Sequence, residues 1–302
     1  MTQAAFEGIM LLVLTWAAMF SVRAGLFNLA LEAEFASGIV ASFFAWMFCP
    51  SIMRLNLFVA GLGCVVVATI VGGVVGKVYG WLTARADLDP IVCGIALNGA
   101  IVPFGAWAYS SWYLPWESAE RGGRNLSARI MALNLDEAGL VLCFIVLAAG
   151  LSGFFTWWLR NSTKGTRLLA SGLSEAAARE AGIEVRRIRL TASVWSGCVC
   201  ALAGALYVFF VSASSYSTES TMGRGFVALA VSLSARRGVF LVGWLAFVLG
   251  ALSTLSQTWF RDIFSSRIQE GNIAFIAGAI PYFAVLALLV AVNVIVRLYR
   301  RT

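Results

Sequence analysis

Residues Phe58–Thr83 read FVAGLGCVVVATIVGGVVGKVYGWLT, an apolar run that carries one charged side chain, Lys77. A helix needs about 20 mostly apolar residues to cross a bilayer, so this run is long enough. The whole chain has the same character, since 60% of its 302 residues are hydrophobic and 12% are charged. Soluble domains carry about 25% charged residues. The composition therefore predicts an all-α polytopic membrane protein.

Other apolar segments repeat this pattern along the chain. The segments of spanning length are Ala5–Val22, Gly25–Phe48, Phe58–Thr83, Ile91–Ser110, Gly139–Leu159, Leu190–Ser212, Val239–Phe260 and Ile273–Ile295. A shorter run, Gly225–Ala235, cannot cross as a straight helix, and we expect a half-helix or part of a broken span that other protein covers. The sequence thus predicts about eight or nine crossings in one transmembrane domain, residues 1–302. With nine crossings, the N-terminus lies outside.

The basic residues predict the orientation of these spans. The polar loop at residues 160–189 holds seven Lys and Arg residues against three acidic ones. If this loop is cytoplasmic, fifteen of the 22 basic residues fall inside, whereas the largest outer loop, Ser111–Glu137, holds three basic and four acidic residues. This distribution follows the positive-inside rule and places the C-terminus in the cytoplasm. The net charge of +7 therefore reflects a lipid bilayer as partner and is no sign of nucleic acid.

Within the cytoplasmic loop, residues 171–187 read SGLSEAAAREAGIEVRR and predict a short polar helix over residues 175–181. Ser174 can accept a hydrogen bond as N-cap, Glu175 lies favourably in the first turn, and Gly182 supplies a C-terminal stop. So short a helix does not persist alone in water, and we expect it to contact another protein. The predicted docking residues are Ser174, Glu175, Ala176, Ala177, Ala178, Arg179, Glu180, Ala181 and Gly182.

Polar residues within the predicted spans are the candidates for a solute path, because such groups are costly at membrane depth and often functional. In a helix that starts near Gly25, Asn28 and Glu32 share one face and Glu34 points elsewhere. Two roles for Glu32 remain open: it caps or pairs with a neighbouring helix end, or it lines the path of a polar solute. The predicted path residues are Asn28, Glu32, Asn98 and Gln257.

Glycines at every fourth position, Gly72, Gly76 and Gly80, form a stripe on the third span. Small residues at this spacing let another helix approach closely. Packing within the subunit is the favoured interpretation, and an interface with another subunit is the alternative.

Several classes of function lack the residues that they need. The chain contains no histidine, which excludes Cys2His2 metal sites and histidine-based acid–base catalysis. Gly76-Lys77 is followed by Val78 and lacks the upstream glycine of a phosphate-binding loop, and no Gly-x-Ser-x-Gly elbow occurs. We therefore expect no catalytic site, metal site or cofactor in this chain.

Four stretches resemble the permease subunits of bacterial ATP-binding-cassette (ABC) importers. Arg23-Ala-Gly-Leu-Phe-Asn-Leu-Ala-Leu-Glu32 is similar to the start of the second span in permeases for nucleosides and simple sugars, although Ala30 and Ala33 stand where the family usually has glycine. Stretches at residues 89–98, 165–182 and 223–230 agree in order and spacing. The chain is thus similar to the nucleoside, simple-sugar and branched-chain amino acid permease superfamily, closest to its nucleoside branch.

This resemblance implies a permease with the type II ABC-importer fold in the bacterial cytoplasmic (inner) membrane. Such a subunit has no ATP site and forms the translocation path for a nucleoside beside a second, different permease subunit. The helix at residues 175–181 would dock on a separate cytoplasmic subunit that hydrolyses ATP with Mg²⁺. An extracytoplasmic solute-binding protein or lipoprotein would deliver the solute.

Two alternatives remain open. Within the same superfamily, the solute is a simple sugar or a branched-chain amino acid. In another class, the chain is an ion-coupled secondary transporter, in which the Glu32 carboxylate belongs to the ion site.

Overall fold

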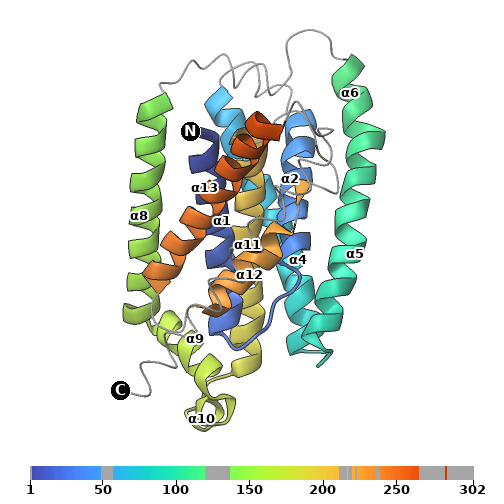
Figure 1. The fold of residues 1–302 in the computed structure, drawn as a ribbon. Coiled ribbons are helices and arrows are strands. Elements are labelled where there is room, and N and C mark those ends of the chain that lie inside the picture. The colour runs from blue at the N-terminus through green and yellow to red at the C-terminus, as the bar shows by residue number, and fades with distance from the viewer. Residues whose placement is uncertain are drawn as a thin grey trace.

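The computed structural model describes residues 2–48, 57–119, 137–210, 216, 220–221, 223–234, 239–264 and 283. Within these ranges the regular elements are all helical (Figure 1). They are α1 (Thr2–Arg23), α2 (Leu31–Phe48), α4 (Leu57–Ala84), α5 (Pro90–Ala108), the π-helical η1 (Tyr109–Tyr113), α6 (Leu114–Ala119), α8 (Glu137–Asn161), α9 (Thr163–Leu173), α10 (Glu175–Glu180), α11 (Val185–Phe210), α12 (Arg224–Ser234) and α13 (Val239–Phe264).

Five helical segments in the described ranges are long and apolar enough to cross a membrane. They are Gln3–Arg23, Leu31–Phe48, Gly61–Ala84, Pro90–Ser118 and Val185–Phe209. Arg224–Leu233 and Phe240–Ser256 are shorter apolar helices. The prediction of an all-α polytopic membrane protein is confirmed. The expected span Ile273–Ile295 lies outside the described residues, so the total number of crossings stays a prediction.

Helix α1 lies in the middle of the bundle, next to α11, with α5 and α8 toward opposite sides (Figure 1). In the most apolar 18-residue stretch of α1, 89% of the residues are buried. The corresponding stretches of Gly61–Ala84 and Pro90–Ser118, which contain α4 and α5, are only 28% buried. The outer helices instead expose large apolar side chains, among them Val66 and Ile70 on α4 and Phe104 and Trp107 on α5. An exposed apolar surface of this kind suits a lipid environment.

The glycine stripe of α4 packs against α11. A Cβ atom at Gly72 or Gly76 would overlap backbone atoms of α11 at Gly197 and Ser193, and a Cβ at Gly80 would lie 2.8 Å from Ser193 Cβ. Because no side chain fits between these backbones, the two helices approach closely. The interpretation of the stripe as packing within the subunit is confirmed.

Helix α1 ends in a tight turn at Gly25, whose φ angle is +76°. The Gly25 amide donates to the Val22 carbonyl at 3.1 Å and the Leu26 amide donates to the Ser21 carbonyl at 2.9 Å. This pair of bonds is a Schellman motif, which closes a helix with a left-handed residue that favours glycine. The turn redirects the chain and prevents α1 from continuing into the next span.

Helix α2 begins at Leu31, six residues after the predicted start of the second span at Gly25. The intervening residues have no helical structure. Asn28 therefore lies outside the helix, and the predicted helical face shared by Asn28 and Glu32 is wrong. Glu32 lies in the first turn of α2.

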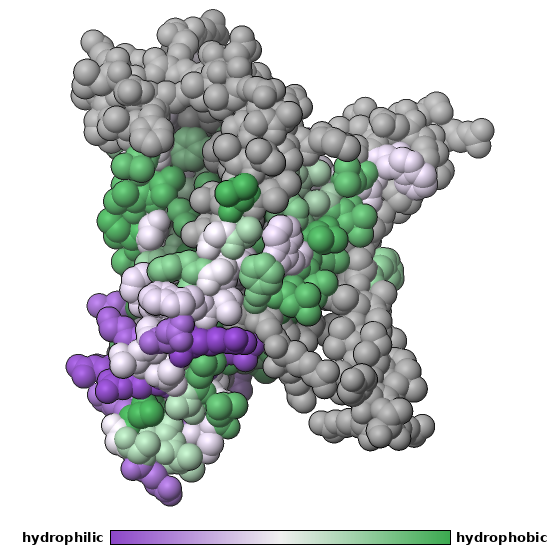
Figure 2. Space-filling view, turned by 90° about the vertical axis from the view of Figure 1, so that its left-hand side faces the viewer, coloured by the Kyte–Doolittle hydropathy of each residue, from purple (hydrophilic) through white to green (hydrophobic). Residues whose placement is uncertain are grey.

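The α9–α10 arm, residues Thr163–Gly182, lies at one end of the bundle, at the bottom of Figure 1, opposite the N-terminus. The last turn of α1, with Arg23, and the α4–α5 connection, with Arg85, reach the same end, where Arg186 Nη2 lies 2.9 Å from Asp87 Oδ2. On the face shown in Figure 2, hydrophilic side chains gather toward the lower end below a mainly apolar region. The described basic residues that were predicted to share one side of the membrane, Arg23, Arg85 and those at residues 160–189, thus lie toward one end of the bundle.

Candidate functional site

The helix predicted at residues 175–181 is observed as α10, Glu175–Glu180. The Ser174 hydroxyl accepts a hydrogen bond from the Ala177 amide at 3.3 Å, which confirms its predicted role as N-cap. At the other end Gly182 has a φ angle of +76°, and its amide donates to the Arg179 carbonyl at 3.0 Å. Both ends are therefore closed by local interactions that the sequence makes readable.

Most of α10 faces outward. The side chains of Ala176, Ala177, Arg179 and Glu180 are exposed, and Ala178 is the buried residue of this helix. Immediately before the N-cap, Leu173 is 87% exposed. The arm thus presents a leucine and the outer face of a short helix beyond the end of the bundle.

The inner side of α10 is attached to α11 through Glu175. Its carboxylate pairs with Arg179 within the helix and with Arg189 Nη2 of α11 at 2.9 Å. Burial acts to raise the pKa of Glu175, but the charges and hydrogen bonds of Arg189 and Arg179 outweigh it, so the net pKa lies below its ordinary value. Glu175 is accordingly held as a carboxylate.

Arg189 and the arm also reach the connection between α1 and α2. Arg189 Nε and the Ser171 hydroxyl each lie 3.5 Å from the Ala24 carbonyl oxygen. A Cβ at Gly25 would lie 3.2 Å from Gly172 Cα, and a Cβ at Gly172 would overlap the Arg23 carbonyl oxygen. The arm and the α1–α2 connection are therefore in direct backbone contact.

The backbone of this connection is held by side chains from other helices. The Tyr79 hydroxyl of α4 donates to the Phe27 carbonyl at 2.8 Å, and Asn98 Nδ2 of α5 donates to the Leu29 carbonyl at 2.8 Å. Non-helical backbone at membrane depth is tolerated where protein groups satisfy it. These contacts explain why the segment remains extended inside an apolar bundle.

Asn28 lies at the centre of a buried polar cluster. Its Nδ2 donates to Glu34 Oε1 at 3.0 Å and to Ser196 Oγ of α11 at 3.1 Å, and its Oδ1 accepts from the Ala30 amide at 2.9 Å. Ser196 Oγ in turn donates to Glu34 Oε2 at 3.2 Å. Glu34, which was expected to point away from Asn28, is its direct partner because Asn28 lies in the connection and not on the helix.

Glu32 binds the start of α12. Its Oε1 accepts from the Gly223 amide and its Oε2 from the Gly225 amide, both at 2.8 Å. A carboxylate that receives the free amides of a helix N-terminus stabilises that helix through hydrogen bonds and its dipole. This geometry agrees with the first of the two roles left open for Glu32, in which it caps the end of a neighbouring helix.

The start of α12 also carries a shielded ion pair. Arg224 Nη2 lies 2.9 Å from Glu7 Oε1 of α1, and the side chains are 17% and 9% exposed. The guanidinium carbon lies 5.0 Å from the centre of the Tyr207 ring of α11. Sequence patterns did not reveal this pair because its members are 217 residues apart.

Three of the four predicted path residues meet around the first turn of α2. Asn98 joins the group from α5, since its Oδ1 accepts from the Ala33 amide at 2.8 Å. Gln257 lies on α13, and its side chain is outside the described residues. All three grouped side chains bind protein groups. Contact of any predicted path residue with a solute stays a prediction.

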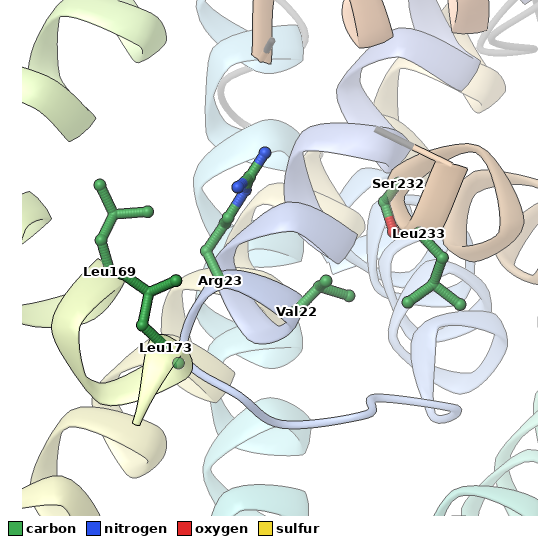
Figure 3. A pocket seen from close by; sticks show the side chains of 7 residues that line it. Val22, Arg23, Leu169, Leu173, Ser232 and Leu233 are labelled. Atoms are coloured by element: carbon green, nitrogen blue, oxygen red, sulfur yellow. The ribbon is translucent and has the colours of Figure 1, made fainter. Parts of the chain in front are cut away.

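A pocket of about 280 Å³ lies elsewhere, between the end of α1, α9 and the end of α12 (Figure 3). In Figure 3, Leu169 and Leu173 lie on one side and Ser232 and Leu233 on the other. Its lining residues are Val22, Arg23, Leu169, Gly172, Leu173, Ser232 and Leu233. The pocket therefore separates the arm from the C-terminal end of α12.

Sequence reasoning missed three residues that organise this region: Glu34, Tyr79 and Arg189. The signal for Glu34 was present, because it is a second acidic residue in an apolar segment. Tyr79 and Arg189 reach the α1–α2 connection through its backbone carbonyls. No side-chain pattern marks such an acceptor.

Comparison with known proteins gives matches over most of the chain. Residues 1–265 match the family model described as the permease component of the branched-chain amino acid transport system. The guanosine ABC transporter permease NupP of Bacillus subtilis is 28% identical over 245 residues, 78% of this chain and 67% of NupP. The nucleoside permease NupB of Lactococcus lactis is 22% identical over 285 residues, 90% of this chain and 75% of NupB.

Two further similarities are to an autoinducer 2 import permease and to one solved structure. The autoinducer 2 import permease LsrC of Escherichia coli O9:H4 is 27% identical over 225 residues, 71% of this chain and 60% of LsrC. Among solved structures, PsaBC of Streptococcus pneumoniae in complex with a Fab aligns with a TM-score of 0.47 and 15% identity, over 93% of this chain and 89% of that chain.

Proposed function

The chain belongs to the permease-component family of branched-chain amino acid transport systems, and from that premise we propose that it forms the translocation path of an ATP-driven nucleoside importer. Family membership makes the chain a multi-pass transport component and not an enzyme. It also implies an ATPase and a solute-binding protein as partners. The proposed path residues are Asn28, Glu32, Asn98 and Gln257.

The nucleoside assignment is supported by the relatives. The permeases NupP, NupB and NupC carry guanosine or nucleoside transport in their names and align over 71–90% of this chain. The similarity to LsrC favours a second candidate, a sugar-like solute. The two candidates share the same coupling to ATP and differ only in the solute.

The arm is proposed to be the contact with the ATPase. A capped helix as short as α10 does not persist alone in water, yet here Glu175 fixes it to α11 while its outer face stays exposed. Leu173, 87% exposed at the same end, offers an apolar anchor. In this arrangement the arm and the C-terminus lie in the cytoplasm of a bacterium, and ATP with Mg²⁺ is hydrolysed by the partner.

The remaining partners follow from the same proposal. A second, different permease subunit would complete the path, and an extracytoplasmic binding protein or lipoprotein would supply the solute. The observation that carries the whole proposal is the match of residues 1–265 to a permease family, together with nucleoside permeases among its relatives.

The test is reconstitution. The chain is purified in mild detergent with the subunits that accompany it, and the complex is placed in liposomes with its binding protein. Uptake of labelled guanosine, uridine, ribose and leucine is then measured with and without ATP. Nucleoside uptake that requires ATP is the expected result. Uptake of ribose alone would favour the sugar-like candidate, and uptake by the pure chain under an ion gradient would overturn the proposal.

A further inference from the structure

The connection between α1 and α2 contacts the arm at one end and α12 at the other. At the contact with the arm the two backbones meet directly, because Gly25 and Gly172 face each other and a Cβ at Gly172 would overlap the chain at Arg23. Arg189 closes this contact, since its guanidinium binds Glu175 of α10 and lies near the Ala24 carbonyl. A displacement of the arm therefore meets the connection directly, with no flexible side chain between them.

The segment between the two contacts is firmly held. Here the linking segment denotes Ala24–Glu32, and its backbone is bound by Tyr79 and Asn98. Asn28 adds hydrogen bonds to Glu34 and Ser196 at the fully buried centre. Packed segments with satisfied polar groups transmit displacement as units instead of absorbing it.

The contact with α12 is equally close. The Glu32 carboxylate accepts two hydrogen bonds from amides at the start of α12. In addition, a Cβ at Gly225 would lie 2.8 Å from the Glu32 backbone nitrogen and 3.0 Å from the Leu31 carbonyl carbon. The first turns of α2 and α12 are thus in backbone contact. The start of α12 has to follow the start of α2.

The other end of α12 is separated from the arm. The pocket of about 280 Å³ lies between Leu169 and Leu173 of the arm and Ser232 and Leu233 of α12 (Figure 3). Movement of the arm toward α12 would first close this space. The linking segment, by contrast, is a packed route from the arm to α12.

We propose that the linking segment carries the movement of the arm to α12, and that Arg189 is the positioning residue that keeps arm and segment together. This inference rests on the proposed function, in which the ATPase moves the arm. It adds the element that is moved inside the membrane, the half-helix α12. It also names the contacts at which the movement enters and leaves the segment, Gly25–Gly172 and Glu32–Gly225.

The proposal is tested in the complete transporter complex, reconstituted in nanodiscs. Spin-labelled non-natural amino acids are placed at Phe226 on α12 and at Val66 on α4, both of which are exposed, so that the six native cysteines are left unchanged. The distance between the labels is measured without nucleotide and with ATP and orthovanadate. In the wild-type complex, we expect ATP to change this distance.

Arg189→Gln breaks the contact of the arm with the linking segment. ATPase binding and hydrolysis should persist, while the ATP-dependent change in distance disappears and uptake falls about two- to thirty-fold, the range typical of mutations along a coupling route. Arg189→Lys, which keeps a cation for Glu175, should restore part of both. Arg187→Gln is the matched control, because Arg187 pairs only with nearby Glu184 at 3.5 Å and is 78% exposed; it should behave as wild type.

A full change in distance in Arg189→Gln would overturn the proposal, as would a wild-type complex that transports without any change at α12. If Arg189→Gln fails to assemble, Tyr79→Phe removes a hydrogen bond that holds the linking segment and is judged by the same criteria. Failure of the proposed function gives a different result, because no ATPase would then bind the wild-type protein.

Discussion

Glu32 Oε2 accepts a hydrogen bond from the Gly225 amide at 2.8 Å, which joins the first turn of α2 to the first turn of α12 across 193 residues of sequence. The second oxygen of the carboxylate binds the Gly223 amide. Glycine at residue 225 is required by this contact, since a Cβ there would lie 2.7 Å from Glu32 Oε2. The short apolar helix α12 therefore begins on a carboxylate supplied by another helix.

The first prediction follows from this cap. Glu32→Gln keeps one carbonyl oxygen and turns an amide NH2 toward a backbone donor, so one amide of α12 loses its partner. We expect a loss of stability of about 1–3 kcal/mol, typical of an unsatisfied buried polar group. Thermal unfolding of the protein in detergent measures this loss of stability, and assembly of the transporter complex is then compared between variant and wild type. Normal stability with impaired transport would instead favour a role of Glu32 in the solute path.

The second prediction concerns the fold of α10. Ala178→Pro removes the hydrogen bond from the Ala178 amide to the Ser174 carbonyl, 3.0 Å long, and costs about 3 kcal/mol within a helix. The variant should insert and bind solute but lose ATP-dependent uptake. Uptake and ATP hydrolysis are measured in liposomes. Normal uptake by Ala178→Pro would count against docking through α10.

The third prediction concerns the exposed leucine of the arm. If Leu173 enters a pocket of the ATPase, Leu173→Ala removes buried apolar surface worth about 1.5–3 kcal/mol. The affinity of the ATPase for the permease in nanodiscs should fall about ten-fold or more, while the melting temperature of the permease stays unchanged. Leu252→Ala on α13 is the control, since Leu252 is exposed on the apolar surface. Equal ATPase affinity in both variants would remove Leu173 from the interface.

The sequence predicted those parts of the fold that depend on local signals. Apolar length located most helices, and the caps Ser174 and Gly182 located α10 within one residue. The start of α2 was predicted wrongly because the extended backbone before it depends on Tyr79 and Asn98. Those partners are brought in by tertiary packing, which periodicity and composition do not encode.

The candidate site was predicted only in part for the same reason. Polar residues at membrane depth identified Asn28, Glu32 and Asn98, which the structure does bring together. Their partners could not be read from helical spacing, because Asn28 lies in a non-helical connection and the bonds of Glu32 and Asn98 reach other elements of the fold. The ion pair of Arg224 with Glu7 is the extreme case, since each residue alone resembles an ordinary charge near a span end.

The fourth prediction is a pH dependence of the arm. The pKa of Glu175 is lowered in the folded protein by Arg189 and Arg179 against the opposing effect of burial. A depressed pKa means that the stabilisation is complete above the unfolded value, about 4.3, and is lost as pH falls through the folded value. The protection of the α10 amides, taken relative to the intrinsic exchange rate at each pH, should therefore be constant from neutral pH to about 5 and fall in more acidic solution. In Glu175→Gln this loss of protection should be absent; an equal loss in both proteins would contradict the assignment.

The fifth prediction tests the contact of α4 with α11. A Cβ at Gly76 would overlap the Ser193 carbonyl oxygen, so Gly76→Ala must push the two helices apart. Overpacking of this kind costs about 1–3 kcal/mol. Gly63→Ala is a matched control on the same helix, because no atom lies within 4 Å of a Cβ at that position. It should be neutral or stabilising by about 0.5–1 kcal/mol, since alanine is the better helix former. Thermal unfolding in one detergent compares both variants with wild type, and equal melting temperatures would show that α4 and α11 are not in backbone contact at Gly76.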